Sequence, residues 1–211
     1  MTETNNTDQY IQEQRQSLEM NPECGNTHYN LGVALLSRKK IAEAENAFLA
    51  AIENSPGLAE AYVQLGAICL QRGDLDGCLD FNTRAVKARP GFSEGYGNIG
   101  FVHFQKGNLD EAIIALERAT AFNFRFLQGL TTLANAYLMK GRVEDSIKTN
   151  MEALKIEPRF AVAHNNLAIA YLEKGDTAKA IVHYDKAVEF GYEVAPQIRD
   201  EIAALRKTVT E

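Results

Sequence analysis

Tryptophan is absent from the 211 residues, and the chain has only three cysteines and five prolines. Cys24, Cys69 and Cys78 are odd in number and show no Cys-x-x-Cys spacing, which argues against a disulfide framework and a zinc site. No apolar run approaches the roughly 20 residues that a membrane-spanning helix needs. The polar residues 1–9 do not resemble a signal peptide. We therefore expect a cytoplasmic protein with no membrane span, no metal and no cofactor.

Basic residues are also in deficit, with 22 Lys and Arg against 28 Asp and Glu and a net charge of −6. A nucleic-acid binder usually carries a basic patch, so we do not expect nucleic acid as a partner. Apolar residues at 45% and charged residues at 24% are typical of a soluble protein.

What the sequence does contain is a 34-residue period. Proline recurs at intervals of 34 residues, with an aromatic residue in its place at two of the six positions: Pro22, Pro56, Pro90, Phe124, Pro158 and Tyr192. A strict step of this length indicates a small repeat that buries its apolar face only by stacking on its neighbours. We divide residues 25–194 into five repeats: 25–58, 59–92, 93–126, 127–160 and 161–194. Residues 1–24 are an N-terminal tail and packing helix, and residues 195–211 a C-terminal capping helix.

Small residues occupy three columns of the aligned repeats, numbered 1 to 34 in each. Position 8 is Gly32, Gly66, Gly100, Ala134 and Ala168; position 20 is Ala44, Cys78, Ala112, Ser146 and Ala180; position 27 is Ala51, Ala85, Ala119, Ala153 and Ala187. Small side chains at fixed points let two helices approach closely. We predict one helix over positions 1–14 and a second over positions 17–30.

The predicted turn between the two helices falls at position 15. Glycine holds it in repeats two to five, at Gly73, Gly107, Gly141 and Gly175. Glycine takes a positive φ without strain and ends the first helix. Repeat one has Lys39 there, which costs about 1 kcal/mol if the same turn forms.

These columns resemble the tetratricopeptide repeat, whose outline is Trp-x-x-Leu-Gly-x-x-Tyr, then Ala-x-x-x-Phe, Ala and Pro. Repeat one matches it with His28, Leu31, Gly32, Leu35, Ala44, Phe48, Ala51 and Pro56. The resemblance implies an all-α, right-handed α-solenoid of helix-turn-helix repeats. Asn82 and Asn150 depart from it at position 24, which is normally aromatic.

The two ends extend this pattern. Residues 8–20 are predicted to form a helix that packs on repeat one, after disordered residues 1–7. Pro196 is suited to open a last helix, because proline is favoured at the first helical position. That helix would cap the exposed apolar end of the array.

The resemblance implies that inner positions 2, 5, 6, 9, 12 and 13 of each first helix line a concave groove. The residues predicted to bind a peptide there are Asn30, Gln64, Asn98, Thr132, Asn135 and Asn166, with Tyr29, Val33, Phe101 and Met139 between them. A row of amides suits an extended peptide backbone, and this row looks like the asparagine ladder of O-linked N-acetylglucosamine transferase. The alternative is that the row is only family consensus.

The charge of the inner positions bears on the partner. The only charged residues at the inner positions are Glu60, Glu94 and Glu173. Members of the family that bind chaperone tails clamp a carboxylate with Lys, Asn and Arg, but Thr131, Pro196 and Asp200 stand where the cations belong. We therefore expect a neutral or basic peptide segment. Position 14 is always basic, which indicates either a ridge for an acidic partner or simply complementation of helix ends.

Signals of other chemistry are weak. Residues 95–100 spell Gly-x-Gly-x-x-Gly, but inside a predicted helix and with no strand before it, so we do not expect a dinucleotide site. His28, His103, His164 and His183 fall in four separate places and show no metal-ligand spacing. No catalytic triad, paired carboxylates or phosphate loop is recognised.

The sequence therefore predicts a non-catalytic scaffold or adaptor that binds an extended or helical segment of another protein. One alternative is a self-associating structural protein, in which the aromatic residues 122–126 and the array ends build homo-oligomers. The other is a detached regulatory module of an enzyme complex.

Overall fold

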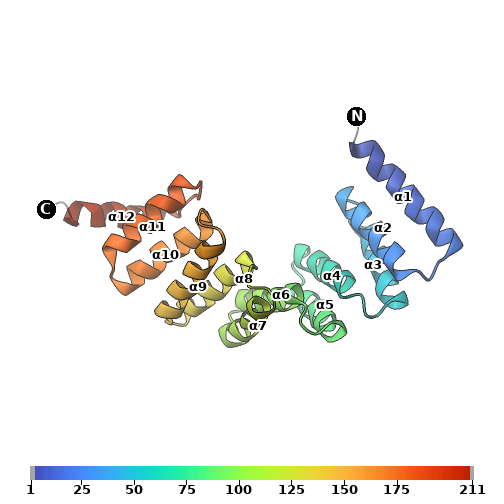
Figure 1. Cartoon of the computed structure of the whole chain (residues 1–211), viewed down its shortest axis with the longest axis horizontal. Helices are drawn as coiled ribbons and strands as arrows, with labels where there is room; N and C mark the ends of the chain where they lie inside the picture. Colours follow the sequence, from blue (N-terminus) through green and yellow to red (C-terminus); the bar gives the residue numbers. More distant parts are fainter. Residues whose placement is uncertain (1–2, 210–211) are drawn as a thin grey trace. The chain divides into compact units, whose positions relative to one another are not determined.

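The computed structural model describes residues 3–209, and the side chains of residues 6–207. The described chain is all-helical and contains no strand. Its helices are α1 (Glu3–Met20), α2 (Gly25–Ser37), α3 (Ile41–Asn54), α4 (Ala59–Gln71), α5 (Leu75–Ala88), α6 (Ser93–Gln105), α7 (Leu109–Phe122), α8 (Leu127–Met139), α9 (Val143–Ile156), α10 (Ala161–Lys174), α11 (Thr177–Glu189) and α12 (Pro196–Val209) (Figure 1). From α2 to α11, first and second helices alternate along the chain.

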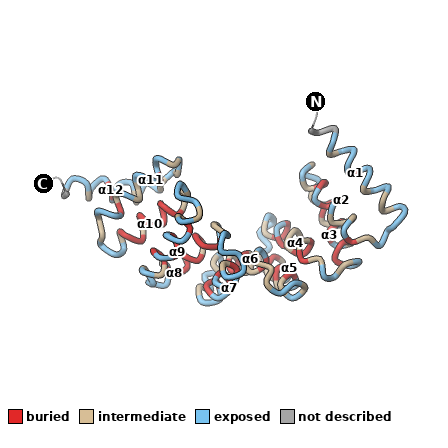
Figure 2. Tube along the Cα trace, in the orientation of Figure 1, coloured by how far each residue is buried: buried red, intermediate tan, exposed pale blue. Residues whose placement is uncertain are grey.

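The chain divides into two compact lobes, residues 1–102 and 103–211, with the boundary inside α6. Within each lobe a first helix packs against its own second helix and against the second helix before it, as α4 does with α5 and α3. Figure 2 shows the buried residues on the faces where these helices meet. The N-terminal lobe has a core around Leu35, Phe48 and Leu65, and the C-terminal lobe one around Leu116 and another around Leu167.

The turn at position 15 forms in every repeat, including the one without glycine. Gly73, Gly107, Gly141 and Gly175 have φ between 72° and 78°, and Lys39 has φ 60°. In each case the amide of the next residue donates to a carbonyl five residues back, for example Lys40 N to Leu35 O at 3.0 Å. This is the Schellman bond that ends a helix. The backbone of Lys39 is therefore strained in the conformation that this turn requires.

Position 8 is small because it packs against position 24 of the same repeat. A Cβ on Gly32 would lie 2.6 Å from the Phe48 ring, and one on Gly66 would lie 2.3 Å from Nδ2 of Asn82. Asn82 and Asn150, which replace the usual aromatic residue at position 24, are both fully buried. Each donates its amide to the carbonyl four residues earlier, at 2.8 and 3.1 Å.

The expectation that residues 1–7 are disordered is wrong for residues 3–7, because α1 begins at Glu3; residues 1 and 2 lie outside the described residues. Ile11 is only 4% exposed, and Asp8 pairs with Arg38 of the first repeat at 2.9 Å. These contacts anchor α1, and each further residue adds one hydrogen bond to a helix that has already nucleated. The residues before residue 8 are polar and show no apolar period, so the sequence did not predict that the helix begins this early.

The last helix, α12, begins at Pro196. Ile202 is 1% exposed and belongs to the core that contains Leu167 and Tyr171 of α10. Arg206, in its final turn, pairs with Asp185 of α11. The division into five repeats with two terminal segments remains a prediction.

Candidate functional site

The ten residues predicted to bind a peptide differ widely in exposure. Asn30, Val33 and Met139 are exposed, Asn166 is buried, and the rest are intermediate: Tyr29, Gln64, Asn98, Phe101, Thr132 and Asn135. They therefore do not form a uniform surface for a partner.

A cavity of about 420 Å³ brings together three of these residues. Five residues of α2 line it, Tyr29, Asn30, Val33, Ala34 and Ser37, together with Asn6, Thr7 and Tyr10 of α1. The cavity exists because α1 packs beside α2 (Figure 1). The α1 side of the cavity was not predicted, because residues 1–7 were expected to be disordered and Tyr10 belongs to no apolar period.

Two amides of the predicted row are instead part of the fold. Asn98 of α6 donates its Nδ2 hydrogen to Oδ1 of Asn82 on α5, at 3.0 Å. Asn166, 68 residues on, is 6% exposed, and neither its Nδ2 nor Oδ1 of Asn150 has a partner among the described residues. Asn82 at position 24 therefore pairs with Asn98 at position 6 of the next repeat, whereas Asn150 and Asn166, at the same two positions, are buried without this hydrogen bond.

Negative charge surrounds Tyr29. Burial raises the pKa of the Tyr29 hydroxyl, and the carboxylates of Glu60 and Glu94 raise it further. Glu60 also pairs with Arg89 at 2.7 Å, whereas Glu94 is exposed and has no ion pair among the described residues.

A second cavity on inner positions lies in the C-terminal lobe, with a volume of about 230 Å³. Ile169, Leu172 and Glu173 of α10 line it together with Ile198 and Glu201 of α12. It therefore combines aliphatic side chains with two carboxylates. The α12 residues were missed because the sequence alone did not place that helix against α10.

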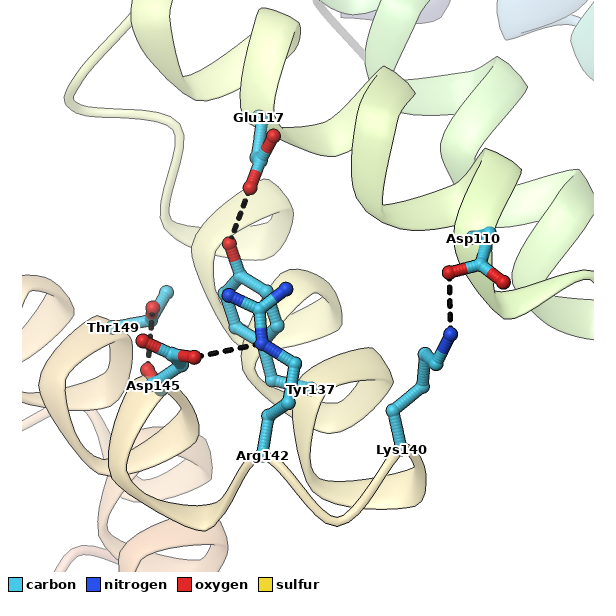
Figure 3. Close-up of polar contacts among 7 residues, drawn as sticks. All are labelled: Asp110, Glu117, Tyr137, Lys140, Arg142, Asp145 and Thr149. Atoms are coloured by element: carbon cyan, nitrogen blue, oxygen red, sulfur yellow. Dashed lines mark hydrogen bonds and ion pairs between the residues drawn. The ribbon is translucent and has the colours of Figure 1, made fainter.

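The opposite, second-helix side of the C-terminal lobe holds a cavity of about 310 Å³ between α7, α8 and α9. Figure 3 shows polar contacts of two lining residues, Tyr137 and Asp145. The Tyr137 hydroxyl donates to Glu117 at 2.6 Å, and Arg142 lies over the Tyr137 ring and pairs with Asp145. Burial, the hydrogen bond and the charge of Glu117 raise the pKa of Tyr137 to about 12. The hydroxyl therefore stays protonated at any physiological pH.

The basic residues at position 14 form ion pairs with the preceding second helix. The pairs are Arg38 with Asp8 (2.9 Å), Arg72 with Glu45, Lys140 with Asp110 (Figure 3) and Lys174 with Glu144 (2.6 Å). Each pair is partly exposed and contributes at most about 1 kcal/mol. These four cations are engaged within the fold, which weakens the interpretation of a ridge for an acidic partner.

The expectation that the four histidines lie apart is wrong for His164 and His183. Their Nδ1 atoms are 2.9 Å apart, and Nε2 of His164 lies 3.1 Å from the carbonyl oxygen of Pro158. Nε2–H of His164 therefore donates to that carbonyl, and its Nδ1 accepts from His183. Burial lowers the pKa of both rings, that of His183 to about 4. Positions 4 and 23 meet across the α10–α11 hairpin, which their 19-residue separation concealed.

The other chemical signals remain weak. The glycine-rich residues 95–100 lie within α6, and a Cβ on Gly95 would come within 2.7 Å of Val86, so close packing explains that glycine. The described residues contain no group of three or more His, Cys, Asp or Glu side chains that could hold a metal ion. Over the same residues, no helix combines the length and apolar character needed to span a membrane.

Solved structures share this fold. YrrB, described as "a TPR protein with an unusual peptide-binding site", aligns with a TM-score of 0.71 and 20% identity over 84% of this chain and 92% of its own. PilF of Pseudomonas aeruginosa aligns with a TM-score of 0.73 and 16% identity, over 87% and 89%. MamA of Desulfovibrio magneticus RS-1 aligns with a TM-score of 0.69 and 20% identity, over 79% and 94%. Identities this low establish the α-solenoid fold alone.

Comparison by sequence gives the family. No curated protein matches the chain. The tetratricopeptide repeat family matches residues 15–59 and 40–91, then 93–125, and finally 161–190. These matches cover both lobes and coincide with the alternating helices, the positive-φ turns and the small-residue columns. The chain therefore belongs to the tetratricopeptide repeat family.

Proposed function

We propose that this protein is a non-catalytic scaffold that binds an extended or helical segment of a partner protein along its inner positions. Membership of the tetratricopeptide repeat family supports a role in protein–protein interaction. The observation that carries the proposal is the 420 Å³ cavity on Tyr29, Asn30 and Val33. Its volume lies within the range of about 300–1,000 Å³ typical of ligand pockets.

The charge of the inner positions supports a neutral or basic segment. Glu60, Glu94 and Glu173 are their only charged residues, and the first two raise the pKa of Tyr29. An acidic segment would be repelled there, because like charges across an interface are costly.

The three free cysteines, Cys24, Cys69 and Cys78, favour the reducing cytoplasm as the location of the protein. Cell fractionation that finds the protein elsewhere would exclude a cytoplasmic location.

Selection from a displayed library of random twelve-residue peptides tests the proposal on the full chain. We expect bound peptides to lose at least tenfold in affinity for Val33→Asp, because a carboxylate would enter the cavity. Val182→Asp, at a 51% exposed position on α11, is the matched control and should bind as wild type. Equal binding by both variants, or no bound peptide at all, contradicts the proposal.

Self-association is the second candidate function, because the end of α7 and the turn that follows it expose large aromatic rings. Phe122 is 57% and Phe124 is 71% exposed. Light scattering over a hundredfold range of concentration distinguishes the two functions. A scaffold keeps the monomer mass throughout, whereas an assembly protein grows in mass and reverts to monomer on Phe124→Ser.

A further inference from the structure

The cavity between α1 and α2 offers a neutral, largely apolar lining. Its eight side chains carry no formal charge at neutral pH: Asn6, Thr7, Tyr10, Tyr29, Asn30, Val33, Ala34 and Ser37. Val33 is 42% and Tyr10 is 39% exposed, so both leave apolar surface in water. An apolar side chain that entered the cavity would cover this surface and be stabilised by the hydrophobic effect.

Two carboxylates of the inner positions contribute negative charge to the lobe that holds this cavity. Glu60 is the second residue of α4 and Glu94 the second residue of α6, at the same place in successive repeats. Tyr29 lines the cavity, and the carboxylates of Glu60 and Glu94 raise the pKa of its hydroxyl, so their negative charge acts on the cavity wall. Glu60 forms an ion pair with Arg89, whereas Glu94 forms no ion pair within the described residues.

Extending the proposed function, on which this step rests, we infer that the bound segment places an apolar side chain in the cavity. We also infer that it carries a lysine or arginine, a few residues away, that faces Glu60 and Glu94. The occupant is a segment of a partner protein with this apolar-plus-basic chemistry. An aromatic side chain together with the unpaired carboxylate of Glu94 suits a cation, because charge and ring quadrupole both attract it.

The same electrostatics disfavour other occupants. Acidic peptides and nucleic-acid phosphates would meet Glu94 without any lysine or arginine among the inner positions to neutralise them. A second copy of this chain is the remaining competitor. It predicts association of the purified protein that Val33→Asp abolishes, and this result would overturn the assignment to a separate partner.

The test uses random twelve-residue peptides selected on the full chain and measures their affinity by fluorescence anisotropy. We expect the selected sequences to pair an apolar residue with lysine or arginine and to be poor in aspartate and glutamate. Glu94→Lys should weaken a selected peptide about tenfold, since attraction becomes repulsion, and Glu94→Gln should weaken it less. Added salt should reduce binding to wild type.

Glu53→Lys is the matched control, because it makes the same charge change at an exposed position of α3 in the same lobe. It should leave affinity within twofold. A peptide whose basic residue is replaced by glutamate should bind Glu94→Lys better than wild type. Circular dichroism of each variant checks that the fold is retained.

The outcomes separate this inference from the function on which it rests. If peptides bind and are lost on Val33→Asp but show no preference for basic residues, the scaffold stands and the cation site is wrong. If basic peptides bind Glu94→Lys and Glu53→Lys equally, the cation site is likewise wrong. If no peptide binds the wild-type chain, both proposals fail.

Discussion

The side-chain amide of Asn98 donates a hydrogen bond to Oδ1 of Asn82 over 3.0 Å, and so joins α6 to α5. Asn82 is fully buried, and its own amide donates to the Cys78 carbonyl at 2.8 Å. A residue that the sequence assigns to partner binding is therefore a structural contact between repeats. The exposed Asn30 differs, because it borders the cavity beside α1.

Asn98→Ala should consequently destabilise the protein, by about 1–3 kcal/mol, because the buried Oδ1 of Asn82 loses its donor. Asn30→Ala should change the free energy of unfolding by less than about 0.5 kcal/mol, as exposed substitutions usually do. Urea unfolding of the two variants measures the difference. Equal stabilities would mean that the Asn98 bond does not persist in solution.

Gly32→Ala should destabilise the N-terminal lobe by about 1–3 kcal/mol, because the added Cβ would lie 2.6 Å from the buried Phe48 ring. This strain outweighs the roughly 1 kcal/mol that alanine gains over glycine in a helix. Gly57→Ala is the control, since nothing lies within 4 Å of its Cβ. Thermal melts that rank Gly32→Ala above Gly57→Ala in stability would refute the packing argument.

Acid should destabilise the C-terminal lobe through His183. Its folded pKa, about 4, lies below the ordinary 6.5, so the unfolded chain binds more protons between these values. The contribution of neutral His183 to the free energy of unfolding is therefore fully present above pH 6.5 and is lost as the pH falls toward 4. After discounting for the partial exposure of the ring, the loss is about 1–2 kcal/mol.

Urea unfolding from pH 7.5 to 4.5 measures this loss. His183→Gln should lose less stability on acidification than wild type. Identical slopes for the two proteins would show that the His164–His183 pair does not govern the acid response.

The three thiols should differ in reactivity. Hydrogen bonds from the Thr27 side chain and backbone lower the pKa of Cys24, at the start of α2. Burial raises the pKa of Cys69 and raises that of Cys78 to about 11. Because the thiolate is the reactive form, Ellman's reagent should modify Cys24 first in the native protein. Simultaneous release of three equivalents without unfolding would contradict the described burial.

The helical architecture was predictable because its determinants are local. The 34-residue period places each helix, and the turn at position 15 holds even at Lys39, since the surrounding bonds fix the backbone there. Small residues at position 8 indicated close packing, and the contact of Gly32 with Phe48 supplies the reason.

The site was less predictable because its features join positions far apart in the sequence. No sequence period relates His164 to His183, which are in contact in the structure. Nothing in the sequence predicted the hydrogen bond from the Asn98 amide to Asn82. The residues of α1 that border the cavity, such as Tyr10, follow no apolar pattern. Side-chain pairing across helices, rather than helix placement, was what the sequence left open.

A crystal structure of the full chain with a library-selected peptide tests the central claim most directly. We predict peptide density over Tyr29, Asn30 and Val33, with an apolar side chain in the cavity beside α1. Density confined to the second-helix side, over Glu117 and Tyr137, would contradict the claim that the inner positions hold the partner.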